Sequence, residues 1–261
     1  MSRPWVVILG ASSGFGAAAA KRFAQEGYGV IGVHLDRRST IEKAEAVRSA
    51  VEAEGAPCMM FNINAADGEL RDSCIAEVQI QLEANGDHIA VLMHSLAFGS
   101  LLPLVSQEGK SLSSKQMTMT IEVMANSLVW WARGVVESGL MGKGGRIFAM
   151  TSSGSQRTIP NYGAVGAAKA ALESHIRYLA AELAPKGITA NSILAGITVT
   201  PALLKIPGSE ELIEGAKARN PHGRLTTPED VADTLIELSR AGTGWLTGNT
   251  LRVDGGEEIC G

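Results

Sequence analysis

Short apolar runs and longer amphipathic stretches alternate along the whole chain. The apolar runs are rich in β-branched and aliphatic residues, which is typical of strands buried on both faces, and they lie near residues 5–10, 29–34, 57–62, 89–94, 145–150, 188–194 and 249–253. Between them, apolar positions at helical spacing predict helices near 14–26, 40–54, 67–84, 114–139, 162–184 and 228–239. This alternation predicts an α/β fold whose parallel sheet carries helices on both faces.

Residue types at the ends of these elements support the same assignment. Gly27, Gly55 and Gly187 each follow a helical pattern, where a residue in the left-handed conformation often ends a helix. Thr227, followed by a proline and two acids, marks a helix start, because a threonine can cap free N–H groups and acids favour the helix dipole. No repeat, linker or low-complexity stretch divides the chain, so residues 1–261 are expected to form one domain.

The segment 197–221 fits neither pattern. It carries Pro201, Pro207 and Pro221, which leave room for a weak helix at most. Long irregular insertions beside the carboxyl ends of parallel strands often close over a substrate. We therefore expect residues 197–221 to form a substrate lid.

Composition limits the classes of function. The 261 residues are 45% hydrophobic and 19% charged, which suits a sizeable core and excludes a disordered chain. A net charge of -4 without a basic block argues against nucleic acid or an anionic membrane as a partner. The first apolar run, Val6 to Leu9, is too short for a signal peptide or a membrane span. Three cysteines without metal-like spacing (Cys58, Cys74, Cys260) lead us to expect free thiols, no metal site and a cytoplasmic location.

A glycine-rich loop directly follows the first predicted strand. Its glycines have the spacing G-x-x-x-G-x-G and open a helix of small residues. Such glycines allow a tight turn and let the backbone approach a pyrophosphate, while the helix N-terminus offers free N–H groups and a favourable dipole. The loop predicts a dinucleotide site in a single Rossmann-like, doubly wound sheet of about seven strands. The expected contacts come from Gly10, Ser12, Ser13, Gly14, Phe15 and Gly16.

The end of the second strand bears on the choice of dinucleotide. An acid there binds the ribose 2′-hydroxyl of NAD, whereas a basic residue accommodates the 2′-phosphate of NADP. Asp36 favours NAD, but it lies about two residues beyond the usual position of that acid. Arg37, Arg38 and Ser39 favour NADP, since two guanidinium groups suit phosphate geometry. We therefore expect NADP(H) rather than NAD.

Further polar residues follow the fourth and fifth strands, where carboxyl ends of parallel strands would bring them together. In chain order they are His94 to Ala97, Asn126, Ser152, Tyr162 and Lys169. Tyr162 precedes Lys169 by seven positions, and residues i and i+7 lie within about 20° on one helix face and about 10 Å apart along its axis. Tyr162 and Lys169 are therefore expected to face one cleft.

With these motifs the chain resembles the short-chain dehydrogenase/reductase family from end to end, including the late segments 223–232 and 253–256. Within that family it is most similar to the bacterial enoyl-acyl-carrier-protein reductases. His94-Ser95 stands where ordinary members have Asn-Asn, and Tyr162 lies seven rather than four positions before Lys169. The ordinary glycine spacing resembles the minor, NADPH-using branch of these enzymes.

The resemblance implies a reaction and roles for its residues. The reaction is NADPH-dependent reduction of a trans-2-enoyl thioester carried by acyl carrier protein or CoA, a step of fatty acid biosynthesis. Tyr162 would stabilise the enolate, while Lys169 would bind the nicotinamide ribose and bias the tyrosine electrostatically. Further cofactor contacts are implied for Asn62, Ile63, Ser95, Leu96, Ala97, Lys169, Gly196, Ile197 and Thr200. A homotetramer is also implied.

Two departures keep a second reaction open. Ser152 replaces a tyrosine of the enoyl reductases and lies 17 residues before Lys169, the place of the active-site serine in ordinary members. Asn126 matches their helix asparagine, which shapes the backbone to hold a water near the lysine. Ser152 and Tyr162 could then share the oxyanion of a 3-ketoacyl thioester or another carbonyl compound, as in a carbonyl reductase or alcohol dehydrogenase. A non-catalytic cofactor sensor on the same fold is disfavoured by the complete catalytic set, and His94 stays outside that set because nothing near it in sequence pairs with it.

Overall fold

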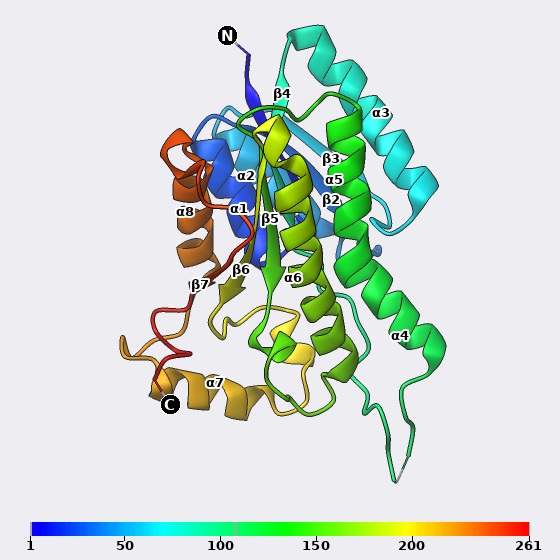
Figure 1. The fold of residues 1–261 in the computed structure, drawn as a ribbon, viewed down its shortest axis with the longest axis vertical. Helices are drawn as coiled ribbons and strands as arrows, with labels where there is room; N and C mark the ends of the chain where they lie inside the picture. Colours follow the sequence, from blue (N-terminus) through cyan, green and yellow to red (C-terminus); the bar gives the residue numbers. More distant parts are fainter. Residues whose placement is uncertain (1, 108, 261) are drawn as a thin grey trace.

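The structure is a computed structural model that describes residues 2–107 and 109–260. Seven strands of this part of the chain form one sheet in which every neighbouring pair is parallel (Figure 1). They are β1 (Pro4–Leu9), β2 (Gly29–His34), β3 (Cys58–Asn62), β4 (His88–His94), β5 (Arg146–Thr151), β6 (Thr189–Ala195) and β7 (Thr250–Val253). The order β3-β2-β1-β4-β5-β6-β7 confirms the predicted Rossmann-like, doubly wound sheet, and each predicted strand end agrees within one residue.

Helices cover both faces of the sheet (Figure 1). One face carries α1 (Gly14–Gln25), α2 (Ile41–Ala53) and α8 (Pro228–Ser239), and the other carries α3 (Gly68–Asn85), α5 (Ser127–Glu137) and α6 (Gly163–Leu183). Strand β1 shows why two layers are needed: Val6 and Ile8 enter the first core, whereas Trp5, Val7 and Leu9 enter the second. Alternate side chains of a strand point to opposite faces, so a continuous apolar run is stable only when both are covered.

Three helical predictions are refined by the structure. The predicted helix 114–139 is α4 (Ser114–Ile121) and α5 joined by a π-helical segment, η1 (Glu122–Asn126). The predicted helix 162–184 begins at Gly163, and the weak helix allowed in the lid is α7 (Ser209–Arg219). Short 3-10 turns are η2 (Ser153–Ser155), η3 (Ala184–Lys186), η4 (Leu203–Lys205) and η5 (Ala241–Thr243).

The predicted helix ends are confirmed by backbone geometry. Gly27, Gly55 and Gly187 have φ of 83°, 72° and 71°, which is the left-handed region. The Thr227 hydroxyl accepts the N–H of Asp230 at 3.2 Å, and the Asp230 carboxylate accepts the Thr227 N–H in return, so the two residues form a capping box.

The direction of strand order reverses between β1 and β4, which is where an open α/β sheet binds ligands at its carboxyl edge. In Figure 1 the arrowheads of β5 and β6 point toward the end of the molecule where α7 and the C-terminus lie. The loops that follow the strands therefore gather at that end. Over the described residues, no helix is both long enough and apolar enough to cross a bilayer.

Candidate active site

The glycine-rich loop has a geometry that only glycine satisfies. Gly10 and Gly14 have φ of 92° and 54°, and a Cβ on Gly16 would lie 2.1 Å from the carbonyl oxygen of Gly10. The side chain of Ser13, the N-cap of α1, makes no capping hydrogen bond, and the first turn contains no acid. The first N–H groups of α1 are therefore available to an anion, which fits the pyrophosphate of a dinucleotide.

The loops predicted to hold a cofactor lie side by side. A Cβ on Gly10 would lie 2.6 Å from the carbonyl oxygen of Ser95 and 3.5 Å from Leu96, so the loops after β1 and β4 are in contact. A Cβ on Gly14 would lie 3.4 Å from the side chain of Thr200, which places the loop after β6 against the start of α1. Ala97 is exposed on the same loop as Ser95. These contacts bring together segments more than 80 residues apart, counted from Gly10 to Ser95.

Gly196 and Ile197 continue from β6 toward the lid. Gly196 has no room for a side chain, since a Cβ would lie 2.5 Å from Thr226 Oγ1. The backbone N–H of Ile197 donates to Glu257 Oε2 at 2.9 Å. While this hydrogen bond to Glu257 is present, the predicted contact of Ile197 with the cofactor has to be made by atoms other than its backbone N–H.

The end of β2 is organised around Asp36. Its backbone N–H donates to Asn62 Oδ1 at 2.9 Å, and Asn62 Nδ2 donates to its carbonyl oxygen at 3.0 Å, which ties the predicted adenine-contacting Asn62 to this turn. Ile63 follows β3 and donates its N–H to His34. The Asp36 carboxylate lies 2.9 Å from His34 Nδ1 and is hydrogen-bonded to Ser12 of the glycine loop. The acid that sequence spacing discounted thus turns back to the cofactor loop.

Hydrogen bonds keep the Asp36 carboxylate ionised. Burial raises the pKa of Asp36, but the side chains of Thr40, Ser12 and His34 outweigh burial and leave that pKa below its usual value. Arg37 and Arg38 are exposed next to it, and neither takes part in an ion pair within the described part of the chain. Both a ribose acceptor and two phosphate donors are therefore present at this turn.

The structure brings Tyr162 and Ser152 together. The Tyr162 hydroxyl lies 3.4 Å from Ser152 Oγ, and Lys169 Nζ donates to the carbonyl oxygen of Met150 at 2.7 Å. Tyr162 does not belong to α6 but precedes it, with φ −100° and ψ 4°, after Asn161 in the left-handed region at φ 61°. Tyr162 therefore reaches the end of β5 from a turn that precedes α6, and not from a position within the helix.

A close approach fixes the tyrosine ring on the loop after β5. A Cβ on Gly154 would lie 2.5 Å from the ring of Tyr162, and a Cβ on Gly166 would lie 2.5 Å from the carbonyl oxygen of Gly154. Glycine at both positions lets α6 and the tyrosine pack directly on the turn that follows Ser152. The same turn therefore positions both hydroxyl groups.

Burial tunes the two titratable groups of this site. It raises the pKa of Tyr162, against a smaller opposite effect of Ser152, so the phenol stays protonated at neutral pH. It also lowers the pKa of Lys169 to about 8, and the nearby Glu173 carboxylate opposes that effect. At neutral pH the site therefore presents a hydroxyl donor and an ammonium group that is mostly charged.

Asn126 lies at the end of the π segment, where its side chain is held by two partners. Its Nδ2 donates to Glu122 Oε2 at 2.8 Å, and its Oδ1 lies 3.1 Å from His175 Nε2 on α6. The side chain thus links η1 to α6, the helix that carries Lys169. Its catalytic assignment stays a prediction.

His94 is fully buried, with Nε2 2.9 Å from the hydroxyl of Ser127. Burial lowers its pKa to about 3, with a smaller contribution from the charge of Lys169, so the imidazole is neutral at physiological pH. This environment agrees with its exclusion from the catalytic set.

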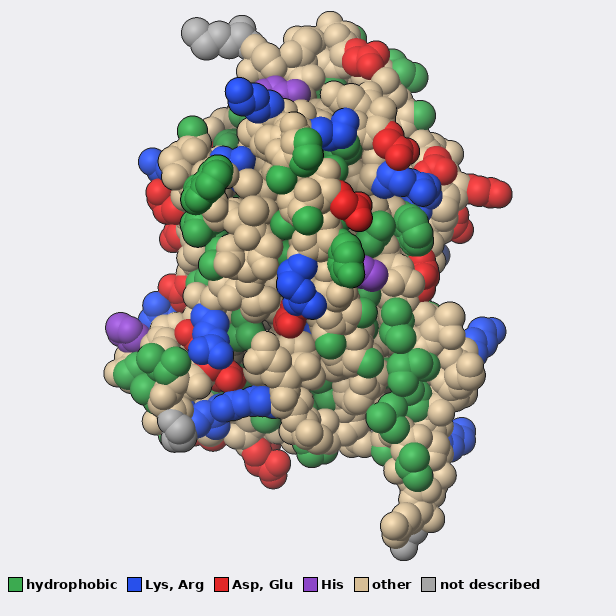
Figure 2. All heavy atoms as spheres, viewed as in Figure 1, with side chains coloured by type: hydrophobic (Ala, Val, Ile, Leu, Met, Phe, Trp, Pro, Cys, Tyr) green, Lys and Arg blue, Asp and Glu red, His purple; other side chains and the backbone are tan. Residues whose placement is uncertain are grey.

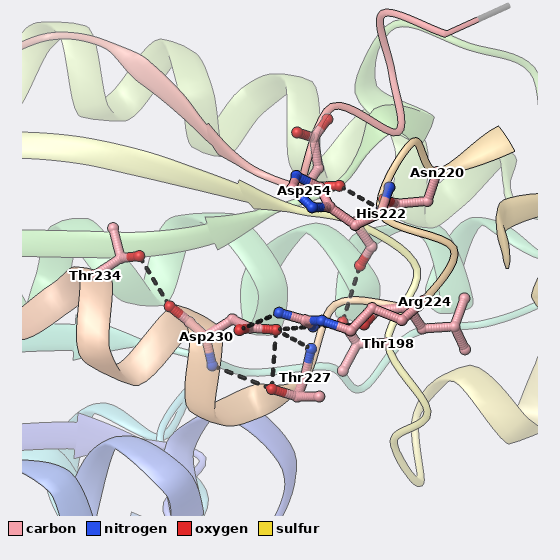
Figure 3. Close-up of polar contacts among 10 residues, drawn as sticks. Thr198, Asn220, His222, Arg224, Thr227, Asp230, Thr234 and Asp254 are labelled. Carbon is pink, nitrogen blue, oxygen red and sulfur yellow. Dashed lines mark hydrogen bonds and ion pairs between the residues drawn. The ribbon is translucent and has the colours of Figure 1, made fainter.

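The lid segment is anchored where it returns to the sheet, as Figure 3 shows. Asn220 Nδ2 donates to the carbonyl oxygen of Asp254 at 2.9 Å, and Arg224 donates to both carboxylate oxygens of Asp230 at 2.6 and 2.8 Å. The Arg224 guanidinium holds the pKa of Asp230 well below its usual range. Residues 197–221 thus have fixed ends, and their role as a lid stays a prediction.

A cavity of about 260 Å³ lies between the loop before Tyr162, the lid and the C-terminal segment. Arg157 pairs with Glu258 at 3.3 Å, and Arg219 of α7 lies 3.6 Å from Glu257. Two adjacent C-terminal acids therefore connect the segment 197–221 to the loop before Tyr162. The sequence did not indicate this connection, because it joins residues distant in the chain. The cavity is lined by Ser153, Arg157, Thr158, Ile159, Ile197, Leu212, Arg219, Glu257 and Glu258.

Comparison with known proteins agrees with this geometry. Residues 10–258 match the family described as Enoyl-(Acyl carrier protein) reductase. The chain is 32% identical to the 1-cyclohexenylcarbonyl-CoA reductase of Streptomyces collinus, over 97% of this chain and 86% of that protein. It is 31% identical to the enoyl-[acyl-carrier-protein] reductase [NADH] FabI of Neisseria meningitidis, over 87% of this chain and 85% of that protein.

Solved structures share the whole fold. The enoyl-[acyl-carrier-protein] reductase (NADH) of Aquifex aeolicus superposes with a TM-score of 0.81 at 28% identity, covering 99% of this chain and 97% of that one. A short-chain dehydrogenase/reductase of Serratia marcescens has the same fold, with a TM-score of 0.82 at 23% identity over 98% of this chain and 97% of that one. The chain therefore belongs to the enoyl-(acyl carrier protein) reductase family of short-chain dehydrogenases/reductases, and is an oxidoreductase that uses a nicotinamide cofactor.

Proposed function

We propose that this enzyme reduces the carbon–carbon double bond of a trans-2-enoyl thioester with NADPH. When bound, NADPH would supply a hydride to the β-carbon, and the electrons of the double bond would shift to give an enolate with its negative charge on the thioester oxygen. A proton from water would then add to the α-carbon and complete the saturated thioester. One observation carries the proposal: Tyr162 precedes α6, seven positions before Lys169, while the position four before Lys169 is the apolar Val165, 4% exposed. A tyrosine displaced in this way suits an oxyanion remote from the carbon that accepts the hydride.

The protonation states support this role for Tyr162. Because burial raises the pKa of the phenol, Tyr162 is a hydrogen-bond donor at neutral pH and can stabilise a developing oxyanion. Lys169 lies two turns along α6 from Tyr162, and its ammonium group is mostly charged at neutral pH. We expect this charge to favour negative charge on the substrate oxygen. We therefore expect the two residues to act as a pair, with Lys169 also binding the nicotinamide ribose.

We propose NADPH as the preferred cofactor on the basis of the turn after β2. Arg37 and Arg38 are exposed and have no ion-pair partner among the described residues, so both can meet a 2′-phosphate. The Asp36 carboxylate already accepts hydrogen bonds from Ser12 and His34, which reduces its capacity to bind a ribose diol. Steady-state kinetics with NADPH and with NADH test this preference directly. A higher kcat/KM with NADH than with NADPH would refute it.

The rim of the site suits an apolar acyl group. Phe98 and Leu104, after β4, and Val199 and Leu204, after β6, are large apolar side chains with more than half of their surface exposed. Leu104 packs against Gly163, the residue after Tyr162, so part of this rim borders the catalytic tyrosine. Exposed apolar residues grouped at a ligand-binding edge indicate a hydrophobic ligand. The family and the named relatives support an acyl thioester of acyl carrier protein or CoA, as in fatty acid biosynthesis.

The decisive experiment compares two classes of thioester. Purified protein is incubated with NADPH and either crotonyl and longer trans-2-enoyl thioesters or the matching 3-ketoacyl thioesters, each on CoA and on acyl carrier protein. We expect oxidation of NADPH with the enoyl series. No oxidation with any enoyl chain length or carrier would refute the proposal.

The second candidate function is reduction of a 3-ketoacyl thioester or another carbonyl compound. It is favoured by the Ser152–Tyr162 pair, because two hydroxyl groups can share the oxyanion of a ketone. The Ser152→Ala substitution separates the two reactions. A carbonyl reductase should lose most of its activity, whereas an enoyl reductase that depends on Tyr162 should retain most of it.

Assembly and location complete the proposal. Figure 2 shows hydrophobic side chains gathered in a strip on the lower right of this view, a surface that would be covered in the homotetramer that we propose. Size-exclusion chromatography with light scattering measures the mass of that assembly. The free thiols Cys58, Cys74 and Cys260 support a reducing, cytoplasmic location.

A further inference from the structure

One buried carboxylate lies behind the catalytic loop. Glu173 is on α6, one helical turn after Lys169, and is 7% exposed. Its Oε1 accepts two hydrogen bonds, from Thr151 Oγ1 at 2.6 Å and from Ser155 Oγ at 2.8 Å. Short bonds to an ionised acceptor are strong, especially away from water.

The two donors stand at either end of the turn that carries Ser152. Thr151 is the last residue of β5, and Ser155 is the last residue of η2. Between them, the N–H of Gly154 donates to Ser152 Oγ at 3.2 Å, and the Tyr162 ring packs on Gly154. A single carboxylate oxygen thus holds the turn closed from both ends. Any movement of that turn would move both hydroxyl groups of the site.

The charge of the same carboxylate also acts on the ammonium group of Lys169, one turn earlier on α6. Lys169 is 5% exposed, and the titratable groups that act on it or feel its charge are Glu173, from its own helix, and the neutral His94, from the end of β4. Met150, from β5, offers a carbonyl oxygen that adds no net charge. Among the described residues, Glu173 is therefore the acid whose charge acts on Lys169.

We infer that Glu173 is a positioning residue for the reaction, which acts through the turn carrying Ser152 and through the charge of Lys169 without touching the substrate. The inference rests on the proposed function, because it assigns Glu173 to the same site. It also explains why a carboxylate is present where an apolar core residue would avoid the cost of burial.

Two substitutions separate the two effects. Glu173→Gln keeps an oxygen acceptor for both hydroxyl groups but removes the charge. The alkaline limb of log kcat, expected near the Lys169 pKa of about 8, should then move to lower pH, since the charge that raises this pKa is gone. The shift should be roughly one pH unit, the lower end of the range for an opposite charge nearby.

Ser155→Ala keeps the charge and the Thr151 hydrogen bond but releases the far end of the turn. It should lower kcat by between about tenfold and a hundredfold, the range typical of a small misplacement of reacting groups. The midpoint of the alkaline limb should not move. KM should change less than kcat, because neither Ser155 nor Glu173 is expected to contact the substrate.

Controls distinguish positioning from folding. Glu182→Gln, an exposed acid on the same helix, should leave kcat and the pH profile unchanged. The melting temperature of each variant shows whether it folds. Folded variants with Glu173→Gln and Ser155→Ala that keep the wild-type kcat and pH profile would overturn the inference.

A second readout does not need turnover. Lys169 is expected to contact the cofactor ribose, so the pH dependence of NADPH affinity, followed by quenching of tryptophan fluorescence, should show the same downward shift in Glu173→Gln. A wild type that binds NADPH but reduces neither enoyl nor keto thioesters would refute the proposed function while this shift stays measurable. An unshifted profile in the variant would refute the role of Glu173 independently.

Discussion

Removing the hydroxyl of Tyr162 gives the sharpest test of the catalytic assignment. In the described structure this hydroxyl has one hydrogen-bond partner, Ser152 Oγ at 3.4 Å, which is longer than the roughly 2.7–2.8 Å of an ordinary O–H···O bond. Tyr162→Phe should therefore cost well under about 1 kcal/mol of unfolding free energy. The transition state, by contrast, loses an oxyanion donor, which costs about 2.7–4 kcal/mol and lowers kcat by roughly 10²- to 10³-fold.

The assay measures kcat with an enoyl thioester and NADPH, together with the melting temperature. Tyr178→Phe is a matched control, because Tyr178 is 67% exposed on the same helix and should affect neither quantity. If Tyr162→Phe keeps kcat within about threefold of the wild type, the hydroxyl does not stabilise the oxyanion and the catalytic assignment of Tyr162 is wrong. A large fall in melting temperature would also contradict it, since the structure gives the hydroxyl only a weak bond to lose.

Three further variants test the cofactor site and the fold. Arg37→Ala with Arg38→Ala should raise KM for NADPH by at least about tenfold and leave KM for NADH nearly unchanged, because charged hydrogen bonds are worth about 1.5–3 kcal/mol; equal effects on both cofactors would contradict a phosphate contact. Gly16→Ala should lose about 1–3 kcal/mol of stability and most NADPH affinity, measured by thermal unfolding and fluorescence titration, since its Cβ would lie 2.1 Å from the Gly10 carbonyl oxygen; wild-type values for both would exclude the loop geometry. Thr227→Ala should lose its N-cap, worth about 1 kcal/mol, and lower the melting temperature by roughly 2–4 °C with kcat unchanged; an unaltered melting temperature would show that the cap is dispensable.

The sequence predicted the sheet well because its signal is local. A strand covered on both faces needs a continuous apolar run, as Val6 to Leu9 shows, and such runs are readable without knowing any partner. The helix ends were equally readable, since Gly27 and Thr227 act on backbone groups within a turn of their own position. The family resemblance, carried by motifs at fixed spacing, was confirmed across residues 10–258.

Residue spacing predicts less where the packing of distant segments decides the backbone conformation. The spacing of Tyr162 and Lys169 predicted one helix face, yet Asn161 and Tyr162 form a turn before α6, and the Tyr162 ring packs on Gly154. Asp36 was discounted by counting residues, whereas its carboxylate folds back to the glycine loop. Neither outcome follows from spacing, since both depend on segments brought together by the sheet.

By itself the sequence determined the order of strands and helices, the glycine loop and the residue types of the catalytic centre, because these depend on neighbours within a few positions. Only the tertiary structure decided which groups interact electrostatically or form a hydrogen bond with each other. The Glu173 carboxylate reaches Thr151 and Ser155, 22 and 18 residues earlier in the chain, because α6 packs against the end of β5. Contacts of this kind arise when chain segments are buried against each other, and no period or spacing in the sequence records them.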